Sequence, residues 1–291
     1  MNLMDEMIRL GLADAPTQYG SGPAKPALPV VTGGPGFVEP EWWPVLCFAL
    51  EHERGATLFG PRGCGKTTAI GELARRMGKA SVILQCAANM QLDSFIGVWA
   101  VEGGTTRFVD GPLTAAVRMS GWLVAEEANA VHPGVWSAVN TLTDRSGAGL
   151  RLPTGEVVPN SPDFRLVLAY NEGYSGTREV NAALKDRLMP VACGYLGQGQ
   201  ESELVAGMTG CEPMAAARVV DVARLIRAAA LRFDLSPRAL ARWVKLASIM
   251  GWKRAYEVAV VDLAGGDSPE NAPTRAALTE IGNNAGMENW A

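Results

Sequence analysis

The sequence LFGPRGCGKTT, from Leu58 to Thr68, contains the pattern G-x-x-x-x-G-K-[ST] between two segments of different character. An apolar run that begins at Ala56 favours a β-strand before the loop, and a helix-compatible run from Thr67 to Met77 follows it. Glycines in this setting let backbone N–H groups turn inward and bind phosphate oxygens at the start of a helix. A glycine-rich turn without a ligand is the alternative, but strand, loop, Lys-Thr and helix in this order favour a nucleoside triphosphate site.

The predicted nucleotide-binding residues form one continuous segment. Lys66 is expected to reach the β- and γ-phosphates, and the hydroxyl of Thr67 is expected to hold Mg²⁺. Further contacts are expected from the rest of the loop, which comprises Gly60, Pro61, Arg62, Gly63, Cys64, Gly65 and Thr68. The predicted cofactors are therefore ATP and Mg²⁺.

The composition is that of a folded globular protein. Of the 291 residues, 48% are hydrophobic and 19% are charged, so the chain is long enough for one large domain and a smaller one. The net charge of −4 argues against a general affinity for nucleic-acid backbones, although it leaves room for a local basic patch.

The cysteine and histidine content bears on metals and on the cellular compartment. Five cysteines are scattered without a C-x-x-C pair, and the two histidines are His52 and His132. This pattern favours reduced thiols and predicts no zinc or histidine-based metal centre. The N-terminal sequence MNLMDEMIRLGLAD has no signal-peptide core, and no apolar run approaches membrane-spanning length. A soluble, cytoplasmic protein is expected.

The first forty residues differ in composition from the rest of the chain. Met1 to Ala13 predicts a short amphipathic helix, and the Pro- and Gly-rich segment from Asp14 to Pro40 predicts a linker or an extended arm. The helix is either a frayed terminus or an element that docks on a neighbouring subunit, and the sequence supports both readings equally.

Residues 41–197 alternate short apolar runs with helical patterns. The run from Ser81 to Cys86 is continuously apolar, as expected for a strand that is buried in a parallel sheet. Further strands are expected at Trp122 to Ala125, Phe164 to Tyr170 and Pro190 to Leu196. This alternation predicts an α/β domain with a doubly wound parallel sheet.

Two segments of this domain predict β-hairpins, Val98 to Val109 and Leu150 to Val158. In the first hairpin, Trp99 and Phe108 are either core residues or contact residues at an exposed tip. The core interpretation is favoured because it is the commoner fate of aromatic residues in a hairpin.

From residue 198 onward the pattern is helical. The expected helices span Glu201 to Met208, Pro213 to Phe233, Pro237 to Met250 and Trp252 to Leu263. They predict a helical domain over residues 198–265, followed by a tail over residues 266–291. Ser236 is a predicted helix cap with Pro237 at the first helical position, which places Arg238 in the opening turn.

Polar residues follow two of the predicted strands. Glu126 and Glu127 end the strand that begins at Trp122, and Asn171 ends the strand that begins at Phe164. Two carboxylates beside a phosphate-binding strand suit Mg²⁺ coordination and activation of an attacking water, which Asn171 is placed to orient. A solvated acidic helix start and a turn-forming asparagine are the alternatives. The position after the phosphate loop favours the catalytic interpretation of the carboxylates.

These segments, in this order, resemble the MoxR class of AAA+ ATPases. The similarity is greatest to the branch that contains the rubisco activase, nitric oxide reductase activation and gas-vesicle ATPases. It covers about Glu41 to Leu196 and the helix around Ser236 to Lys245, and its most telling segments are GPRGCGKT, FVDGPLTAAVR, LVAEEAN and DFRLVLAYNEGY. The resemblance implies a P-loop AAA+ core with a C-terminal helical lid domain.

The resemblance assigns a role to each candidate in the core. Lys66 and Thr67 match the residues that hold phosphate and Mg²⁺. Glu126 stands where the family usually has the Mg²⁺-side aspartate, and Glu127 stands where it has the water-activating glutamate. Asn171 matches the sensor that positions the attacking water.

Two arginines match positions that contact nucleotide in these ATPases. Arg187 matches the arginine finger that is donated to the γ-phosphate of the next subunit, and Arg238 matches the second sensor in the lid. The hairpin at Val98 to Val109 matches the insertion that projects toward the ring pore. The hairpin at Leu150 to Val158 matches the insertion before the first sensor.

The sequence departs from the family pattern at two positions. Glu126 keeps the negative charge of the usual aspartate but adds a methylene. The longer side chain is a reason to expect weaker or displaced coordination of Mg²⁺. Lys185 stands where relatives often have an additional arginine. One contact to the neighbouring subunit would therefore be made by a single ammonium group rather than by the paired N–H donors of a guanidinium. Because an arginine finger contributes on the order of 10³ to 10⁵ in rate, Arg187 alone is expected to sustain turnover, with altered coupling around the ring.

The expected function is that of an ATP-hydrolysing remodelling motor whose subunits form a ring, expected to be a hexamer, with ATP bound between neighbours. The resemblance also implies a client or adaptor protein with a von Willebrand factor A-type domain. A nucleotide-gated assembly or scaffold protein with weak or no hydrolysis is the alternative, and Glu126 is its main support. A small-molecule kinase would not explain the lid helices or Arg187, and the acidic balance does not favour a DNA motor.

Overall fold

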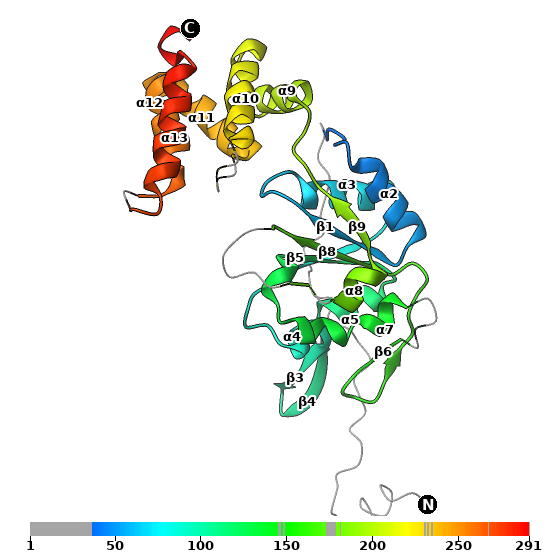
Figure 1. Cartoon of the computed structure of the whole chain (residues 1–291). Helices are drawn as coiled ribbons and strands as arrows, with labels where there is room; N and C mark the ends of the chain where they lie inside the picture. The colour runs from blue at the N-terminus through cyan, green and yellow to red at the C-terminus, as the bar shows by residue number, and fades with distance from the viewer. Residues whose placement is uncertain are drawn as a thin grey trace, which may run out of the picture.

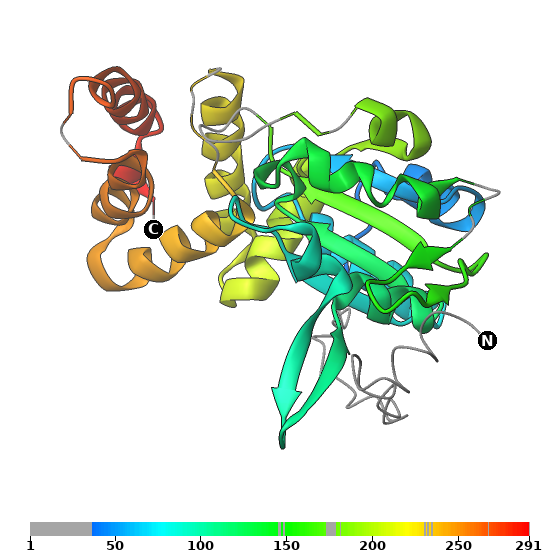
Figure 2. The same cartoon turned by 90° about the horizontal axis from the view of Figure 1, so that it is seen from below.

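The computed structural model describes residues 37–144, 147, 149–172, 179–180, 182–229, 231, 233, 235–266 and 268–290, without the side chain of Glu102. The predicted N-terminal helix and most of the arm, up to residue 36, lie outside these residues. An α/β part built on a parallel sheet is followed by an all-helical part (Figures 1 and 2).

Five parallel strands form the central sheet in the order β2-β5-β8-β1-β9. In chain order they are β1 (Gly55–Phe59), β2 (Ser81–Gln85), β5 (Trp122–Glu126), β8 (Arg165–Tyr170) and β9 (Met189–Ala192). The predicted parallel α/β fold is confirmed. Because the strands are parallel, the phosphate loop after β1 emerges at the same edge of the sheet as the ends of β5 and β8.

Helices cover both faces of this sheet (Figure 1). On β5, Trp122 and Val124 belong to one hydrophobic core, whereas Leu123 and Ala125 belong to the other, because successive side chains of a strand point to opposite faces. The first core is covered by α2 (Trp43–His52) and α3 (Lys66–Arg76). The second is covered by α4 (Leu92–Ile96), α5 (Pro112–Arg118), α6 (Pro133–Ser137), α7 (Asn140–Thr143) and α8 (Ala182–Arg187).

Both predicted hairpins are present. Strand β3 (Gly97–Glu102) pairs with β4 (Thr105–Asp110), and β6 (Leu150–Arg151) pairs with β7 (Val157–Val158). The β3–β4 hairpin projects away from the sheet in both views (Figures 1 and 2).

The aromatic pair of the β3–β4 hairpin differs from the expectation. Trp99 and Phe108 face each other across the strands, with ring centroids 5.5 Å apart. Phe108 packs against the core, but Trp99 is 47% exposed. The prediction that Trp99 is a core residue is therefore wrong, because the hairpin stands clear of the sheet and its partner ring covers only part of the indole.

The helical part consists of α9 (Gln198–Thr209), α10 (Pro213–Ala228), α11 (Pro237–Met250), α12 (Trp252–Tyr256) and α13 (Ala272–Asn284). A π-helical turn over Glu257–Val261 extends α12. Trp243 is fully buried at the centre, with its ring centroid 5.1 Å from that of Tyr256. Leu278 and Met287, from the C-terminal segment, belong to the same core. Among the residues described, no helix has both the length and the apolar character needed to cross a bilayer.

A buried ion pair joins α9 to α10. The side chain of Glu201 is fully buried, and its two carboxylate oxygens accept hydrogen bonds of 2.7 and 2.8 Å from Arg227. Arg227 also donates from Nε to the carbonyl of Leu235 at 3.2 Å, and its guanidinium lies 3.7 Å from the ring centroid of Tyr195. Since Tyr195 lies in the connection between β9 and α9, this cluster ties the helical part to the α/β part.

Glu201→Ala is expected to lower the free energy of unfolding of the helical part by about 3 kcal/mol, because Arg227 would keep its charge in a largely buried position without its carboxylate. The measurement is urea denaturation followed by tryptophan fluorescence. Glu257→Ala is the control, since the Glu257–Arg254 pair is 43% and 66% exposed and such pairs contribute about 0–1 kcal/mol. Equal small losses in both variants would contradict the prediction.

Candidate nucleotide-binding site

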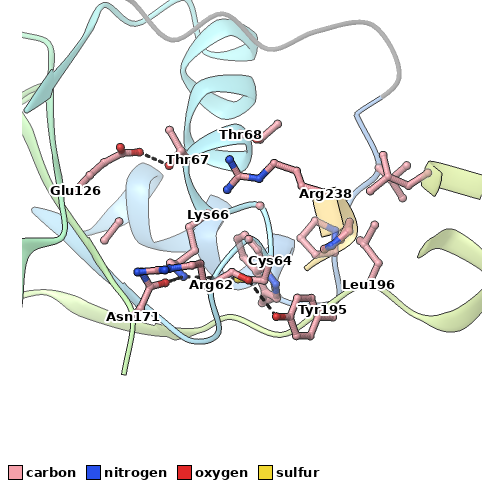
Figure 3. A pocket seen from close by; sticks show the side chains of 18 of the residues that line it. Arg62, Cys64, Lys66, Thr67, Thr68, Glu126, Asn171, Tyr195, Leu196 and Arg238 are labelled. Carbon is pink, nitrogen blue, oxygen red and sulfur yellow. Dashed lines mark hydrogen bonds between the residues drawn. The ribbon is translucent and has the colours of Figure 1, made fainter. Parts of the chain in front are cut away.

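A cavity of about 800 Å³ lies at the carboxyl ends of the central strands (Figure 3). Its polar side is formed by the phosphate loop from Arg62 to Thr68 and by the acidic pair after β5. Its lining also includes the apolar residues Phe37, Val38, Pro40, Leu196, Leu204 and Met208. The cavity thus offers both polar and apolar surface, as a nucleotide with a triphosphate and a base requires.

The phosphate loop has the backbone conformation that its glycines predict. Gly63 and Gly65 have φ angles of 74° and 94°, which residues with a Cβ rarely adopt. Gly65 is the N-cap of α3, so the free N–H groups of the first helical turn face the cavity. A Cβ at Gly63 would lie 2.6 Å from the Cβ of Ser236, which caps α11. The loop therefore packs directly against the start of α11.

Lys66 is buried and its ammonium group is fully hydrogen-bonded. Nζ donates to the carbonyl oxygens of Gly60 and Pro61 at 3.1 and 2.9 Å, and to Oδ1 of Asn171 at 2.8 Å. Gly60 and Pro61, which were predicted to bind nucleotide, do not line the cavity. Their carbonyl oxygens accept hydrogen bonds from Lys66 and so orient the lysine.

Thr67 and Glu126 meet at the start of α3. The Thr67 hydroxyl donates a hydrogen bond to Oε1 of Glu126, and both residues line the cavity (Figure 3). Oxygen donors suit Mg²⁺, which takes one or two protein ligands and completes its shell with phosphate and water. The residues present therefore fit the metal. Although Glu126 is one methylene longer than aspartate, its carboxylate still contacts the hydroxyl of Thr67.

Glu127 and Asn171 form a second contact, and Asn171 also contacts Lys66. Nδ2 of Asn171 donates to Oε1 of Glu127 at 2.8 Å, while Oδ1 of the same amide accepts from Lys66. The amide thus presents its oxygen to a cation and its nitrogen to a carboxylate. Glu127 has a left-handed backbone conformation, with φ of 52°, so its side chain leaves the end of β5 in a different direction from Glu126.

Among the residues that the sequence did not predict for the site are three that support its loops. Asn129 is buried, and its Nδ2 donates to the backbone oxygen of Asn171 at 2.9 Å. The hydroxyl of Tyr195 donates to the carbonyl of Arg62 at 3.0 Å (Figure 3). Ser236 packs against Gly63, as described above. Only Ser236 had a sequence signal, its helix-cap pattern, and that signal indicated a helix start rather than a contact with the loop.

The two predicted arginines lie in different places. Arg238 lines the cavity from the first turn of α11 (Figure 3). Arg187 does not line it: its Nε donates to Oδ1 of Asp144 and its Nη1 to the carbonyl of Ala183, both at 2.7 Å. Lys185, on the same helix α8, is exposed. The cavity of one chain is therefore built without Arg187.

Comparison with known proteins gives one family match and several relatives. Residues 55–188 match the family described as AAA domain (dynein-related subfamily). The chain is 31% identical over 167 residues to Protein CbbQ of Hydrogenophilus thermoluteolus, an alignment that covers 57% of this chain and 62% of the relative. It is 28% identical to the denitrification regulatory protein NirQ of Pseudomonas aeruginosa, with 62% and 69% covered. It is 29% identical to Protein NorQ of Paracoccus denitrificans, with 56% and 61% covered.

These alignments extend over three fifths to about two thirds of the relatives' own length. A solved structure from Cytophaga hutchinsonii aligns with 82% of this chain and 87% of its own, at 18% identity and a TM-score of 0.45. This likeness is too distant to carry an argument. The similarity to CbbQ, NirQ and NorQ agrees with the resemblance found in the sequence.

Proposed function

Because residues 55–188 match the family described as AAA domain (dynein-related subfamily) and the chain is similar to CbbQ, NirQ and NorQ, we propose that this chain is a ring-forming ATPase of the MoxR class that remodels a partner protein complex. In this proposal ATP is bound between neighbouring subunits, and its hydrolysis moves the helical lid and the projecting hairpin. The ring is expected to be a hexamer. The observation that carries the proposal is a cavity lined by Lys66, Thr67, Glu126, Glu127, Asn171 and Arg238 but not by Arg187.

The triphosphate would lie along the loop from Arg62 to Thr68, and the base would lie against the apolar residues of the lining. Lys66 would exchange its contacts with loop carbonyls for phosphate oxygens, which bear more negative charge and bind an ammonium group more strongly. Thr67 and Glu126 would hold Mg²⁺, which when bound neutralises charge on the β- and γ-phosphates.

Glu127 is the proposed general base. Its carboxylate would accept the proton of the attacking water, and the amide of Asn171 would fix the direction of the carboxylate through the 2.8 Å contact. Asn129 supports this arrangement because it holds the backbone of Asn171. Hydrolysis then needs one more cation to stabilise the charge that develops on the γ-phosphate.

A neighbouring subunit is the proposed source of that cation. Arg187 lies on α8, outside the cavity of its own chain, and is paired with the part-exposed Asp144. A surface ion pair of this kind is weak, at about 0–1 kcal/mol, so a phosphate of the next subunit would displace Asp144 readily. This arrangement makes hydrolysis dependent on assembly.

The alternative function, a nucleotide-gated scaffold with weak or no hydrolysis, depended on Glu126 in place of aspartate. The contact between Glu126 and the Thr67 hydroxyl supports the catalytic proposal, because the longer side chain reaches the expected metal position. Glu127 and Asn171, already in contact, support it further.

The partner complex is proposed on two grounds. The relative NirQ is described as a denitrification regulatory protein, and the sequence resemblance implies an adaptor with a von Willebrand factor A-type domain. On the chain itself, the β3–β4 hairpin exposes Val98, Trp99 and Val101 at 52, 47 and 77%. Such apolar side chains on a projecting element are suited to contact with another protein.

The test is ATP turnover per subunit as a function of protein concentration, with the assembly state followed by analytical ultracentrifugation. Turnover is expected to rise with the fraction of assembled chain and to be negligible for the monomer, because a monomer has no neighbour whose Arg187 can reach its cavity. Turnover that is independent of assembly would contradict the inter-subunit site. A ring that binds ATP without turnover, even with candidate partners added, would favour the scaffold.

A further inference from the structure

Two cysteines meet under the phosphate loop. Cys64 belongs to the loop and lines the nucleotide cavity, whereas Cys193 follows β9; both side chains are buried in the same hydrophobic core. The backbone N–H of Cys193 donates to the carbonyl of Phe59 at 2.8 Å, and a Cβ at Gly60 would lie 3.3 Å from the Cβ of Cys193. The Sγ of Cys193 donates to the carbonyl of Val191 at 3.5 Å, and the thiols of Cys64 and Cys193 influence each other's titration.

The surroundings of the two thiols make them chemically unequal. The pKa of Cys64 is lowered to about 7, first by the hydrogen bond from the Cys193 thiol and then by the charge of Lys66, against the opposing effect of burial. Nζ of Lys66 lies 3.7 Å from Sγ of Cys64. The pKa of Cys193 is raised by its hydrogen bond with Cys64 and by burial. Cys64 is thus the thiolate of the pair, and Cys193 holds the proton.

Another buried cysteine near the site provides the contrast. Cys86 follows β2 at the same edge of the sheet, but burial and the nearby charges of Glu126 and Glu127 raise its pKa to about 12. It does not line the cavity. Reactivity is therefore expected of Cys64 and not of Cys86, because the thiolate is the nucleophile.

We propose that Cys64 and Cys193 form a peroxide-responsive dithiol site in the floor of the nucleotide cavity. The Cys64 thiolate attacks one oxygen of hydrogen peroxide, the O–O bond breaks, and a sulfenic acid and a hydroxide form; the hydroxide takes up the proton that Cys64 had released to solvent and becomes water. Sγ of Cys193 then attacks the sulfur of Cys64, the S–O bond breaks, and the hydroxyl leaves as a second water with the Cys193 proton. Two thiols are oxidised to one disulfide while peroxide is reduced to two waters.

The disulfide would couple oxidation to nucleotide binding, and this coupling rests on the proposed nucleotide site. The loop is held between Cys193 on one side and Ser236 of the lid on the other, so a covalent bond at Cys64 restrains the segment that must wrap phosphate. Conversely, bound ATP would cover Cys64 and draw Lys66 toward phosphate, which removes the charge that favours the thiolate. At tenfold excess over Kd, ATP is expected to slow oxidation about tenfold, because only about a tenth of the sites remain empty.

The experiment uses the full chain, reduced and then exposed to hydrogen peroxide, with peptide mapping by mass spectrometry. A link between the peptides that contain Cys64 and Cys193 is expected, reversible by dithiothreitol, in the wild type and in the Cys86→Ser control. Cys193→Ser is expected to accumulate the Cys64 sulfenic acid, which dimedone traps. Thermal melting establishes that each variant is folded. Absence of the 64–193 link in folded wild type, or the same oxidised products with and without Cys193, would overturn the proposal.

Two further readouts separate this proposal from that of the nucleotide site. Alkylation of Cys64 by iodoacetamide is expected to rise with pH around a midpoint near 7, and Cys193→Ala is expected to move the midpoint upward because alanine, unlike serine, cannot donate a hydrogen bond to the Cys64 sulfur. An unshifted midpoint would contradict the dithiol site. If the disulfide forms but ATP gives no protection, the dithiol site stands and the assignment of the cavity to nucleotide fails.

Discussion

Arg187→Ala is expected to lower kcat for ATP hydrolysis by about 10³-fold, at the lower end of the range for an arginine finger. ATP binding to the isolated subunit is expected to be unchanged, because Arg187 lies outside its own cavity and is paired with Asp144. Turnover in the assembled ring and binding of a fluorescent ATP analogue are the two measurements. Arg254→Ala, at an exposed ion pair of the helical part, is the control and is expected to keep wild-type turnover.

A mixing experiment tests whether Arg187 acts on the neighbouring subunit. Lys66→Ala subunits keep the finger but lack a working cavity, and Arg187→Ala subunits have the reverse defect. In a head-to-tail ring mixed in equal parts, about a quarter of the boundaries combine an intact cavity with an intact finger. Recovery of about a quarter of wild-type turnover is expected. No recovery in rings shown to contain both variants would contradict donation between subunits.

Glu127→Gln is expected to lower kcat by about 10² to 10⁴-fold, the usual contribution of a general base, while ATP binding changes little. The amide oxygen of glutamine can still accept the hydrogen bond from Asn171, so the substitution removes the basicity of the side chain and preserves its placement. Single-turnover hydrolysis and equilibrium ATP binding separate these two effects.

The control for Glu127→Gln is Glu172→Gln, which removes an exposed negative charge one residue beyond Asn171. It is expected to retain wild-type kcat. If Glu127→Gln also retained it, the base would have to be another group, and Glu126 would be the next candidate because it lines the same cavity.

The parts of the site that could be predicted from the sequence are those with a local signal. The phosphate loop requires glycines with positive φ and a helix start directly after them, and these requirements fall within a single short segment. The acidic pair and Asn171 could be predicted because parallel strands bring their carboxyl ends to one edge of the sheet. The β3–β4 hairpin was predictable from its Gly-Gly turn.

The remaining parts depend on contacts between distant segments. Asn129 and Asn171 are 42 residues apart, Arg187 and Asp144 are 43 apart, and Tyr195 and Arg62 are 133 apart. No local pattern specifies such partners, because each depends on how two finished elements pack. The exposure of Trp99 was missed for the same reason. The hairpin itself had a local signal, but no local pattern shows how far the hairpin projects from the central sheet.

The backbone of Glu127 has a consequence for how this protein would respond to laboratory evolution. A left-handed conformation costs a residue with a Cβ roughly 1–2 kcal/mol, whereas glycine adopts it without this steric cost. Glu127, the proposed base, has a φ of 52°. The backbone at this position therefore favours glycine, which has no side chain to act as a base. Selection for heat tolerance alone would act against the carboxylate, so stabilised descendants of this chain are best chosen with turnover scored alongside melting temperature.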